Sequence, residues 1–274
     1  MKIIDVKLDT VCGYTSTLPV FDEPEIAFAG KSNVGKSSLI NAVMKRRRLA
    51  RVGETPGKTR TINFYHVVAE VPQVTEQGTV NVPALQPNME DAAGDAGSLQ
   101  AEAIRKKKLR WKKDPSRQKA LSGKNGQARV RGSQKEDASQ TAVRVPTERK
   151  PFFLVDLPGY GYANVSVSEK EKWGEMIERY LNSSPGLKKV FLLVDIRHEP
   201  NANDIQMYDW VRASGFTPVI IATKADKLGK SQQLRQIEVI RRTLKAPEAA
   251  EILPFSAPSG QGLGEIYRVI QQVI

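Results

Sequence analysis

Residues 30–37 read Gly-Lys-Ser-Asn-Val-Gly-Lys-Ser, the Gly-x-x-x-x-Gly-Lys-Ser pattern of a phosphate-binding loop (P-loop). Gly30 and Gly35 allow consecutive backbone N–H groups to turn inward and surround phosphate oxygens. The Lys36 side chain can reach the β- and γ-phosphates of a nucleotide, and the Ser37 hydroxyl can ligate Mg²⁺. This octapeptide therefore predicts a site for a nucleoside triphosphate.

The residues around this loop fit the same interpretation. Residues 25–30 are an apolar run that predicts a buried strand, and residues 37–44 predict a helix with Leu39 and Ile40 on its apolar side. This arrangement directs the positive end of the helix dipole at the phosphates.

A later segment indicates which base is read. Residues 219–226, Val-Ile-Ile-Ala-Thr-Lys-Ala-Asp, predict an apolar strand that runs into a polar turn. The Asp226 carboxylate can accept hydrogen bonds from guanine N1–H and N2–H₂, a donor pair that adenine lacks, so the wrong base would leave this carboxylate without partners. The stem of Lys224 can lie along the base plane. After another short apolar strand, backbone N–H groups near Ser256 and Ala257 could hold guanine O6.

Two loops are candidates for sensing the γ-phosphate. Residues 152–163 predict an apolar strand that ends in Asp156-Leu-Pro-Gly159; Asp156 can hold Mg²⁺ through water, and the Gly159 N–H can bond the γ-phosphate. Residues 53–65 carry Thr55, Thr59 and Thr61 in a Gly/Pro-containing loop before a strand, and Thr59 is the expected Mg²⁺ ligand. Loss of the γ-phosphate would release both loops.

Apolar strands alternate with amphipathic helices through residues 25–69 and 151–274, a pattern typical of an α/β fold whose mainly parallel sheet is flanked by helices. The nucleotide then belongs at the C-terminal ends of the strands. Trp173 and Trp210 have helical spacing and are expected to pack in the core, and Asn203 is a candidate helix N-cap.

The first residues of the chain have a different periodicity. Ile4, Val6 and Leu8 alternate with charged residues, which predicts a half-buried strand.

Residues 70–150 interrupt the α/β pattern with a low-complexity insertion that is expected to be disordered. Its segment 105–135 holds 13 lysines and arginines against one acid, Asp114, so its net charge of +12 equals that of the entire chain. Three roles remain open for this basic segment. It could bind rRNA by neutralising phosphates, with Trp111 stacking on an unpaired base, it could be a dispensable solvated loop, or it could contact an anionic membrane surface.

Five segments together resemble the EngB family of ribosome-assembly GTP-binding proteins: PEIAFAGKSNVGKSSLIN, PGKTRTINFY, VDLPGYGYA, DIRHEPNANDIQMYDW and TKADK. The resemblance covers roughly residues 22–69 and 151–274 and implies a single three-layer P-loop NTPase domain (a G domain) formed by 1–69 and 151–274, with GTPase activity. It also implies a GTP-operated switch in large ribosomal subunit assembly, with the precursor subunit and rRNA as partners, and an association with normal cell division and septation. Members of the family usually cross the gap at 70–150 with a short hairpin, so the resemblance says nothing about the insertion.

The resemblance also implies nucleotide contacts residue by residue. They are Gly30, Lys31, Ser32, Asn33, Val34, Gly35, Lys36, Ser37, Gly57, Lys58, Thr59, Arg60, Thr61, Asp156, Leu157, Pro158, Gly159, Thr223, Lys224, Ala225, Asp226, Phe255, Ser256 and Ala257. The implied Mg²⁺ ligands are Ser37 and Thr59, with Asp156 acting through water. Lys36, Thr59 and Gly159 are the expected catalytic groups.

One position departs from the Ras-like plan. Tyr160 follows Gly159 where Ras-like proteins place a glutamine that orients the attacking water, so slow intrinsic hydrolysis is expected, accelerated by a partner or a monovalent cation. Asn33 either helps to bind K⁺ beside the phosphates or only stabilises its loop.

The remaining composition narrows the choice of function. A single cysteine, Cys12, excludes a disulfide framework, and two histidines argue against a His-based metal site. No apolar run is long enough to span a membrane and charges interrupt the N-terminus, so a cytoplasmic monomer is expected, with no membrane partner. Two alternatives stay open: a module that holds GTP with negligible turnover and acts in division through a protein partner, and a P-loop ATPase or kinase, against which Asp226 argues.

Overall fold

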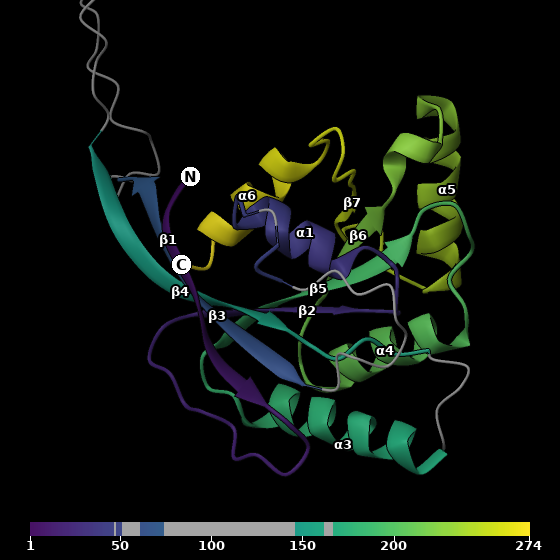
Figure 1. The fold of residues 1–274 in the computed structure, drawn as a ribbon. Coiled ribbons are helices and arrows are strands. Elements are labelled where there is room, and N and C mark those ends of the chain that lie inside the picture. The colour runs from purple at the N-terminus through teal and green to yellow at the C-terminus, as the bar shows by residue number, and fades with distance from the viewer. Residues whose placement is uncertain (47, 51–60, 74–145, 162–166) are drawn as a thin grey trace, which may run out of the picture. The chain divides into compact units, whose positions relative to one another are not determined.

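The computed structural model describes residues 1–46, 48–50, 61–73, 146–161 and 167–274. Within these residues, one seven-stranded sheet carries helices on both of its faces (Figure 1). The strands are β1 (Lys2–Cys12), β2 (Glu25–Gly30), β3 (Ile62–Pro72), β4 (Thr147–Asp156), β5 (Leu187–Asp195), β6 (Val219–Thr223) and β7 (Ile252–Pro254). The helices are α1 (Lys36–Val43), α3 (Val167–Ser183), α4 (Ala202–Ala213), α5 (Lys230–Thr243) and α6 (Leu263–Gln271), with a short 3₁₀ turn at Ala225–Lys227.

The order of the strands across the sheet is β1-β3-β4-β2-β5-β6-β7. The five strands from β4 to β7 run parallel, whereas β3 pairs antiparallel with both β4 and β1. Every residue of β2 and of β6 is buried, as expected for central strands covered on both faces. The expected α/β architecture with a mainly parallel sheet is confirmed, and the loops that follow β2, β4, β5, β6 and β7 meet at one edge of the sheet.

Two apolar layers hold the helices on the sheet. Tyr180 of α3, Tyr208 of α4 and Ile240 of α5 belong to the layer on one face. Leu39 of α1 and Ile266 of α6 belong to the layer on the other face. No helix within the described residues is long and apolar enough to cross a membrane.

Strand β1 differs from the sequence-based expectation. Its pairing with β3 has two register shifts, one between Ile3 and Asp5 and one just after Leu8. Ile4 lies within the first shift, where a bulge disturbs the alternation of faces, and it is 36% exposed. Val6 is half-buried, whereas Leu8, in the same uninterrupted register as Val6, is 44% exposed. The prediction that these three side chains share one half-buried face is therefore wrong.

The start of α4 also differs from the expectation. Its N-cap is Asn201 rather than Asn203, because Asn201 Oδ1 accepts hydrogen bonds from the N–H groups of Asn203 and Asp204 at 2.9 and 3.2 Å. Asp204 Oδ2 in turn accepts from the Asn201 N–H at 3.0 Å, which completes a capping box.

Strands β3 and β4 flank the insertion. They stay paired as far as Pro72 and Thr147, a few residues beyond the expected boundaries. The basic segment 105–135 lies outside the described residues.

Candidate nucleotide-binding site

The P-loop connects β2 to α1. Gly35 has a φ of 111°, a conformation that side chains other than glycine rarely adopt, and α1 begins directly after it. Gly30 is restricted by space, since a Cβ there would lie 2.9 Å from Val34 Cγ1. The first N–H groups of α1 have no partner within the helix, so this turn can receive a phosphate.

Lys36 and Asp156 form a buried ion pair at the centre of the site. Their residues are 8% and 2% exposed, and Lys36 Nζ donates to Asp156 Oδ1. A buried ammonium group needs a countercharge, and the carboxylate at the end of β4 supplies it. Nucleotide phosphates would compete with Asp156 for Lys36.

The oxygen groups beside this pair suit Mg²⁺. Ser37 lies half-buried in the first turn of α1, and Asp156 ends β4. Mg²⁺ usually takes one or two protein oxygens and completes its shell with water and phosphate oxygens. The described part of the chain holds no cluster of three or more His, Cys, Asp or Glu that could form an all-protein metal cage.

The chain that follows β4 lies directly against the P-loop. Tyr160 O accepts from the Ser32 N–H at 2.9 Å and from Ser32 Oγ at 3.2 Å, and the Tyr160 N–H donates to Gly30 O at 3.4 Å. A Cβ at Gly159 would lie 3.1 Å from Ser32 Oγ, so a larger residue here would require Ser32 to shift by a few tenths of an ångström. Within the described residues the Gly159 N–H makes no hydrogen bond, which leaves it available for a phosphate oxygen.

The Tyr160 side chain reaches the start of α4. Its hydroxyl donates to Asp204 Oδ1 on α4 at 3.0 Å. Burial, together with the nearby Asp204 carboxylate, raises the pKa of Tyr160 well above its usual value. In this conformation the hydroxyl proton of Tyr160 is engaged by Asp204.

On the base side, the last residue of β6, Thr223, and the residue after it, Lys224, are bonded to the P-loop. Thr223 Oγ1 lies 2.7 Å from Val34 O and 3.0 Å from Val194 O. Lys224, in the left-handed conformation, donates from Nζ to Asn33 O at 2.9 Å.

Lys224 also pairs with a carboxylate that the sequence analysis missed. Its Nζ lies 2.9 Å from Asp195 Oδ2, and Arg197 pairs with the same oxygen at 2.7 Å. These two cations hold the pKa of Asp195 well below its usual value despite its partial burial, which opposes them. Asp195 follows an apolar strand, as Asp156 does, and that position was the available signal.

Asp226 is oriented before any base binds. Its Oδ1 accepts from Ser256 Oγ at 2.9 Å, and this hydrogen bond lowers the pKa of Asp226. The Ser256 N–H donates to Gln261 O at 3.1 Å and is therefore engaged. The Ala257 N–H makes no hydrogen bond among the described residues, so of the two amides expected to hold guanine O6 it is the one available.

The remaining expected contacts divide into three groups. Gly57, Lys58, Thr59 and Arg60 lie outside the described residues. Thr61 is described and donates from Oγ1 to Asn63 Oδ1 at 3.0 Å. Residues such as Leu157, Ala225 and Phe255 are buried and shape the loops, for example through the Ala225 N–H, which donates to Phe255 O at 3.0 Å.

Comparison with known proteins gives a consistent result. A family model described as "50S ribosome-binding GTPase" matches residues 25–109. A "probable GTP-binding protein EngB" of Lachnoclostridium phytofermentans is 39% identical over 100% of this chain and 96% of its own length. The protein of the same description from Clostridioides difficile is 34% identical over 98% of this chain and 93% of its own length.

Solved structures agree on the fold. A crystal structure of a probable GTP-binding protein EngB has a TM-score of 0.50 at 18% identity, covering 91% of this chain and 97% of that chain. Era in complex with MgGDPNP and nucleotides 1506–1542 of 16S ribosomal RNA also has a TM-score of 0.50 at 18% identity, covering 91% of this chain and 56% of that chain. At this identity the likeness shows the P-loop GTPase fold alone.

Proposed function

This chain belongs to the EngB family of GTP-binding proteins and is a P-loop GTPase, and from that premise we propose that it acts as a GTP-operated switch in assembly of the large ribosomal subunit. In the GTP state it docks on a precursor of that subunit, and it leaves after hydrolysis. A contribution to normal cell division and septation, and a cytoplasmic location, belong to the same proposal. The 50S ribosome-binding description of the matching family model supports the choice of partner, and the 16S rRNA bound to Era supports only, and more weakly, an rRNA contact.

On the phosphate side, the P-loop N–H groups and Lys36 bind the β- and γ-phosphates. Ser37 and Thr59 would hold Mg²⁺, with Asp156 acting through water, and a bound ion would supply positive charge beside the phosphate oxygens. The Gly159 N–H contacts a γ-phosphate oxygen. Water attacks the γ-phosphate in line, and Lys36 and the backbone N–H groups stabilise the developing charge.

The observation that carries the switch is the bonding of Tyr160 to Ser32. The residue that follows the γ-phosphate sensor is hydrogen-bonded to the P-loop at both its N–H and its C=O. Binding of a γ-phosphate to the Gly159 N–H would therefore disturb the hydrogen bonds that Tyr160 makes with Ser32 and Gly30. Such an exchange couples the nucleotide state to the segment leading into α3.

A second candidate function is a GTP-binding module with negligible turnover that acts through a protein partner. The turn of Tyr160 toward Asp204 favours it, because no water-positioning side chain replaces glutamine at this place. A K⁺ ion bound beside the phosphates with the help of Asn33 would compensate for the missing glutamine by accelerating hydrolysis. A GTPase rate that does not change in a K⁺ titration would remove the K⁺ role.

Co-sedimentation tests the main proposal. Purified protein loaded with a non-hydrolysable GTP analogue, with GDP or with no nucleotide is centrifuged with ribosomal subunits. We expect it to pellet with large subunits, or their precursors, chiefly in the GTP-analogue state, and we expect subunits to increase GTP turnover. Equal pelleting in all three states would reject a GTP-operated switch.

The insertion is proposed to be an arm that binds rRNA. Replacing residues 74–145 with a short turn keeps the paired ends of β3 and β4, since the Gln73 N–H still donates to Pro146 O. We expect weaker rRNA binding and a smaller dependence of affinity on salt. An unchanged affinity and salt slope would leave the dispensable loop as the explanation.

A further inference from the structure

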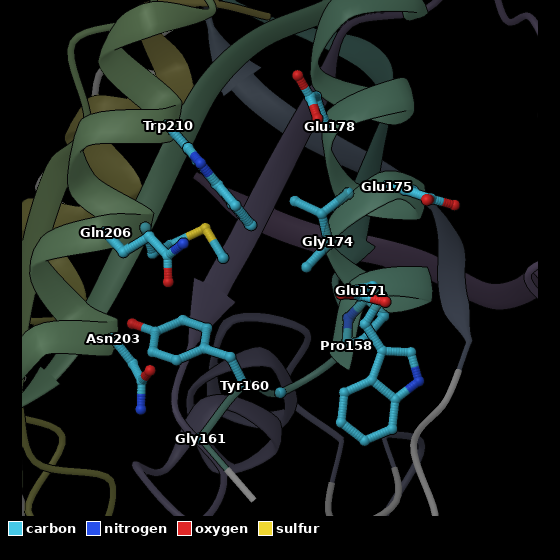
Figure 2. A pocket seen from close by; sticks show the side chains of 14 residues that line it. Pro158, Tyr160, Gly161, Glu171, Gly174, Glu175, Glu178, Asn203, Gln206 and Trp210 are labelled. Atoms are coloured by element: carbon cyan, nitrogen blue, oxygen red, sulfur yellow. The ribbon is translucent and has the colours of Figure 1, made fainter. Parts of the chain in front are cut away.

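A cavity of about 660 Å³ lies between α3 and α4, beside the segment that follows β4. Figure 2 shows Trp210, Gln206 and Asn203 of α4 facing Gly174 of α3, with Tyr160 between the two helices. The size falls within the range of about 300–1,000 Å³ that is usual for ligand pockets. Trp173 and Trp210 were expected from their helical spacing to pack in the core, but both also line this groove, because that spacing does not distinguish a core position from a groove wall.

The groove is acidic in a chain whose net charge is +12. Its described lining residues include Glu171, Glu175 and Glu178 and no lysine or arginine. The spacing of three and four residues places these glutamates on one side of α3. Two cations of α3 lie elsewhere: Lys172 is over the Tyr14 ring, and Arg179 donates to Tyr14 O at 3.0 Å.

Two of the three carboxylates are available to a partner. Glu175 accepts a hydrogen bond from the Tyr14 hydroxyl at 2.5 Å and points away from α4 (Figure 2). Glu171 and Glu178 are exposed and make no hydrogen bond or ion pair with the described residues. Because aromatic walls and free carboxylates lie together, the groove suits a cation attached to an apolar side chain and repels a phosphate backbone.

Both ends of the groove are fixed by close contacts. At one end, a Cβ on Gly174 would lie 3.0 Å from Trp210 Cη2, so the helices approach closely there. At the other end, the Tyr160 hydroxyl bonds Asp204 at the start of α4. Since Tyr160 directly follows Gly159, movement of Gly159 on nucleotide binding would change the shape of the groove.

We infer that this groove docks an arginine- and lysine-rich peptide segment of a protein partner, with one large apolar side chain inserted between Trp210 and Tyr160. The binding mode is an apolar anchor in a pocket with charge pairs at its rim. The dependence of this docking on nucleotide rests on the proposed GTP switch. The existence of the groove and the charge of its lining do not depend on that proposed switch.

Fluorescence anisotropy of labelled 12-residue peptides tests the inference on the full-length protein. Three peptides are compared: one with lysine and arginine flanking a central phenylalanine, one with the same flanks and a central serine, and one with glutamate flanks and the phenylalanine. Each is measured with GDP and with a non-hydrolysable GTP analogue bound. A labelled single-stranded RNA forms the fourth arm.

Charge reversal supplies the matched variants. Glu171→Lys with Glu178→Lys changes the groove, and Glu248→Lys with Glu265→Lys makes the same change in net charge at exposed positions outside it. Gln206→Trp is the second variant; it fills the groove from an exposed position that makes no hydrogen bond through its side chain with the described residues. GTP affinity is measured for every variant and reports separately on the nucleotide site.

The expected result is that only the basic peptide with phenylalanine binds well. Its affinity should fall about tenfold or more in the groove charge reversal and in Gln206→Trp, and less than about threefold in the control pair. Three results would overturn the inference. They are equal affinity of the basic phenylalanine peptide for the groove variant and the control variant, equal affinity of the serine and phenylalanine peptides, and loss of RNA binding in the groove variants. The groove variants can lose peptide binding as expected while the parent protein binds the peptide equally with GDP and with the GTP analogue. In that case the docking groove stands and its control by nucleotide fails.

Discussion

The two ends of the nucleotide site differ in how far they are organised before a nucleotide binds. At the base end, Ser256 already orients Asp226, and Lys224 already bridges the P-loop and Asp195. At the phosphate end, Lys36 is paired with Asp156, so this pair must exchange partners to bind phosphate and metal. In the proposed site, the groups that would select the base are therefore already arranged, whereas those that would bind the triphosphate must first exchange partners.

The largest expected effect comes from breaking the phosphate end with Lys36→Ala. GTP affinity should fall about 1,000-fold by calorimetry, since the side chain makes charge-assisted contacts with two phosphates. Without nucleotide, the variant should also lose about 3 kcal/mol of unfolding free energy, because Asp156 is left buried and unpaired.

A double variant separates these two effects. Lys36→Met with Asp156→Leu removes both charges and should recover most of the stability without recovering GTP binding. Recovery of GTP binding by this variant would contradict the role assigned to the pair.

The base end is broken by Asp226→Asn. GTP affinity should fall about 100-fold, because the amide NH₂ group meets the donors of guanine. Xanthosine triphosphate, which has a carbonyl in place of the 2-amino group, should bind the variant better than the parent protein. An unchanged preference for GTP, measured by competition, would show that the base is read elsewhere.

Ser256→Ala tests the orientation of that carboxylate and should weaken GTP binding about fivefold. The hydrogen bond from Ser256 lowers the pKa of Asp226, so the ionised form that guanine needs persists to lower pH in the parent protein. As pH falls, GTP affinity should therefore drop at a higher pH in the variant. Ser259→Ala, in the same loop, is the control and should leave the pH profile unchanged.

The smallest effect is expected from Tyr160→Phe, which removes the hydrogen bond to Asp204 and should lower the unfolding free energy by about 1 kcal/mol. Because the folded-state pKa of Tyr160 is raised, its contribution is present below its unfolded pKa and is lost as pH rises above about 10. GTP hydrolysis should change less than about threefold, since the phenol points toward α4. A tenfold decrease would give Tyr160 a direct part in hydrolysis.

Motifs that end an apolar strand were predictable from the sequence. Asp156 and Asp226 each follow such a run, and a parallel sheet brings the ends of its strands to one edge. The ion pair of Lys36 with Asp156 and the turn of Tyr160 toward Asp204 were not predictable, because each joins residues far apart in the chain. The bulges of β1 were missed for a related reason: they are set by its pairing with β3.

The most direct test of the account is competition between GTP and ATP for the purified protein in the presence of Mg²⁺. ATP should compete at least about 100-fold less well than GTP, since adenine offers Asp226 no donor pair. Equal competition by the two nucleotides would contradict base selection by Asp226 and with it the assignment of the whole site.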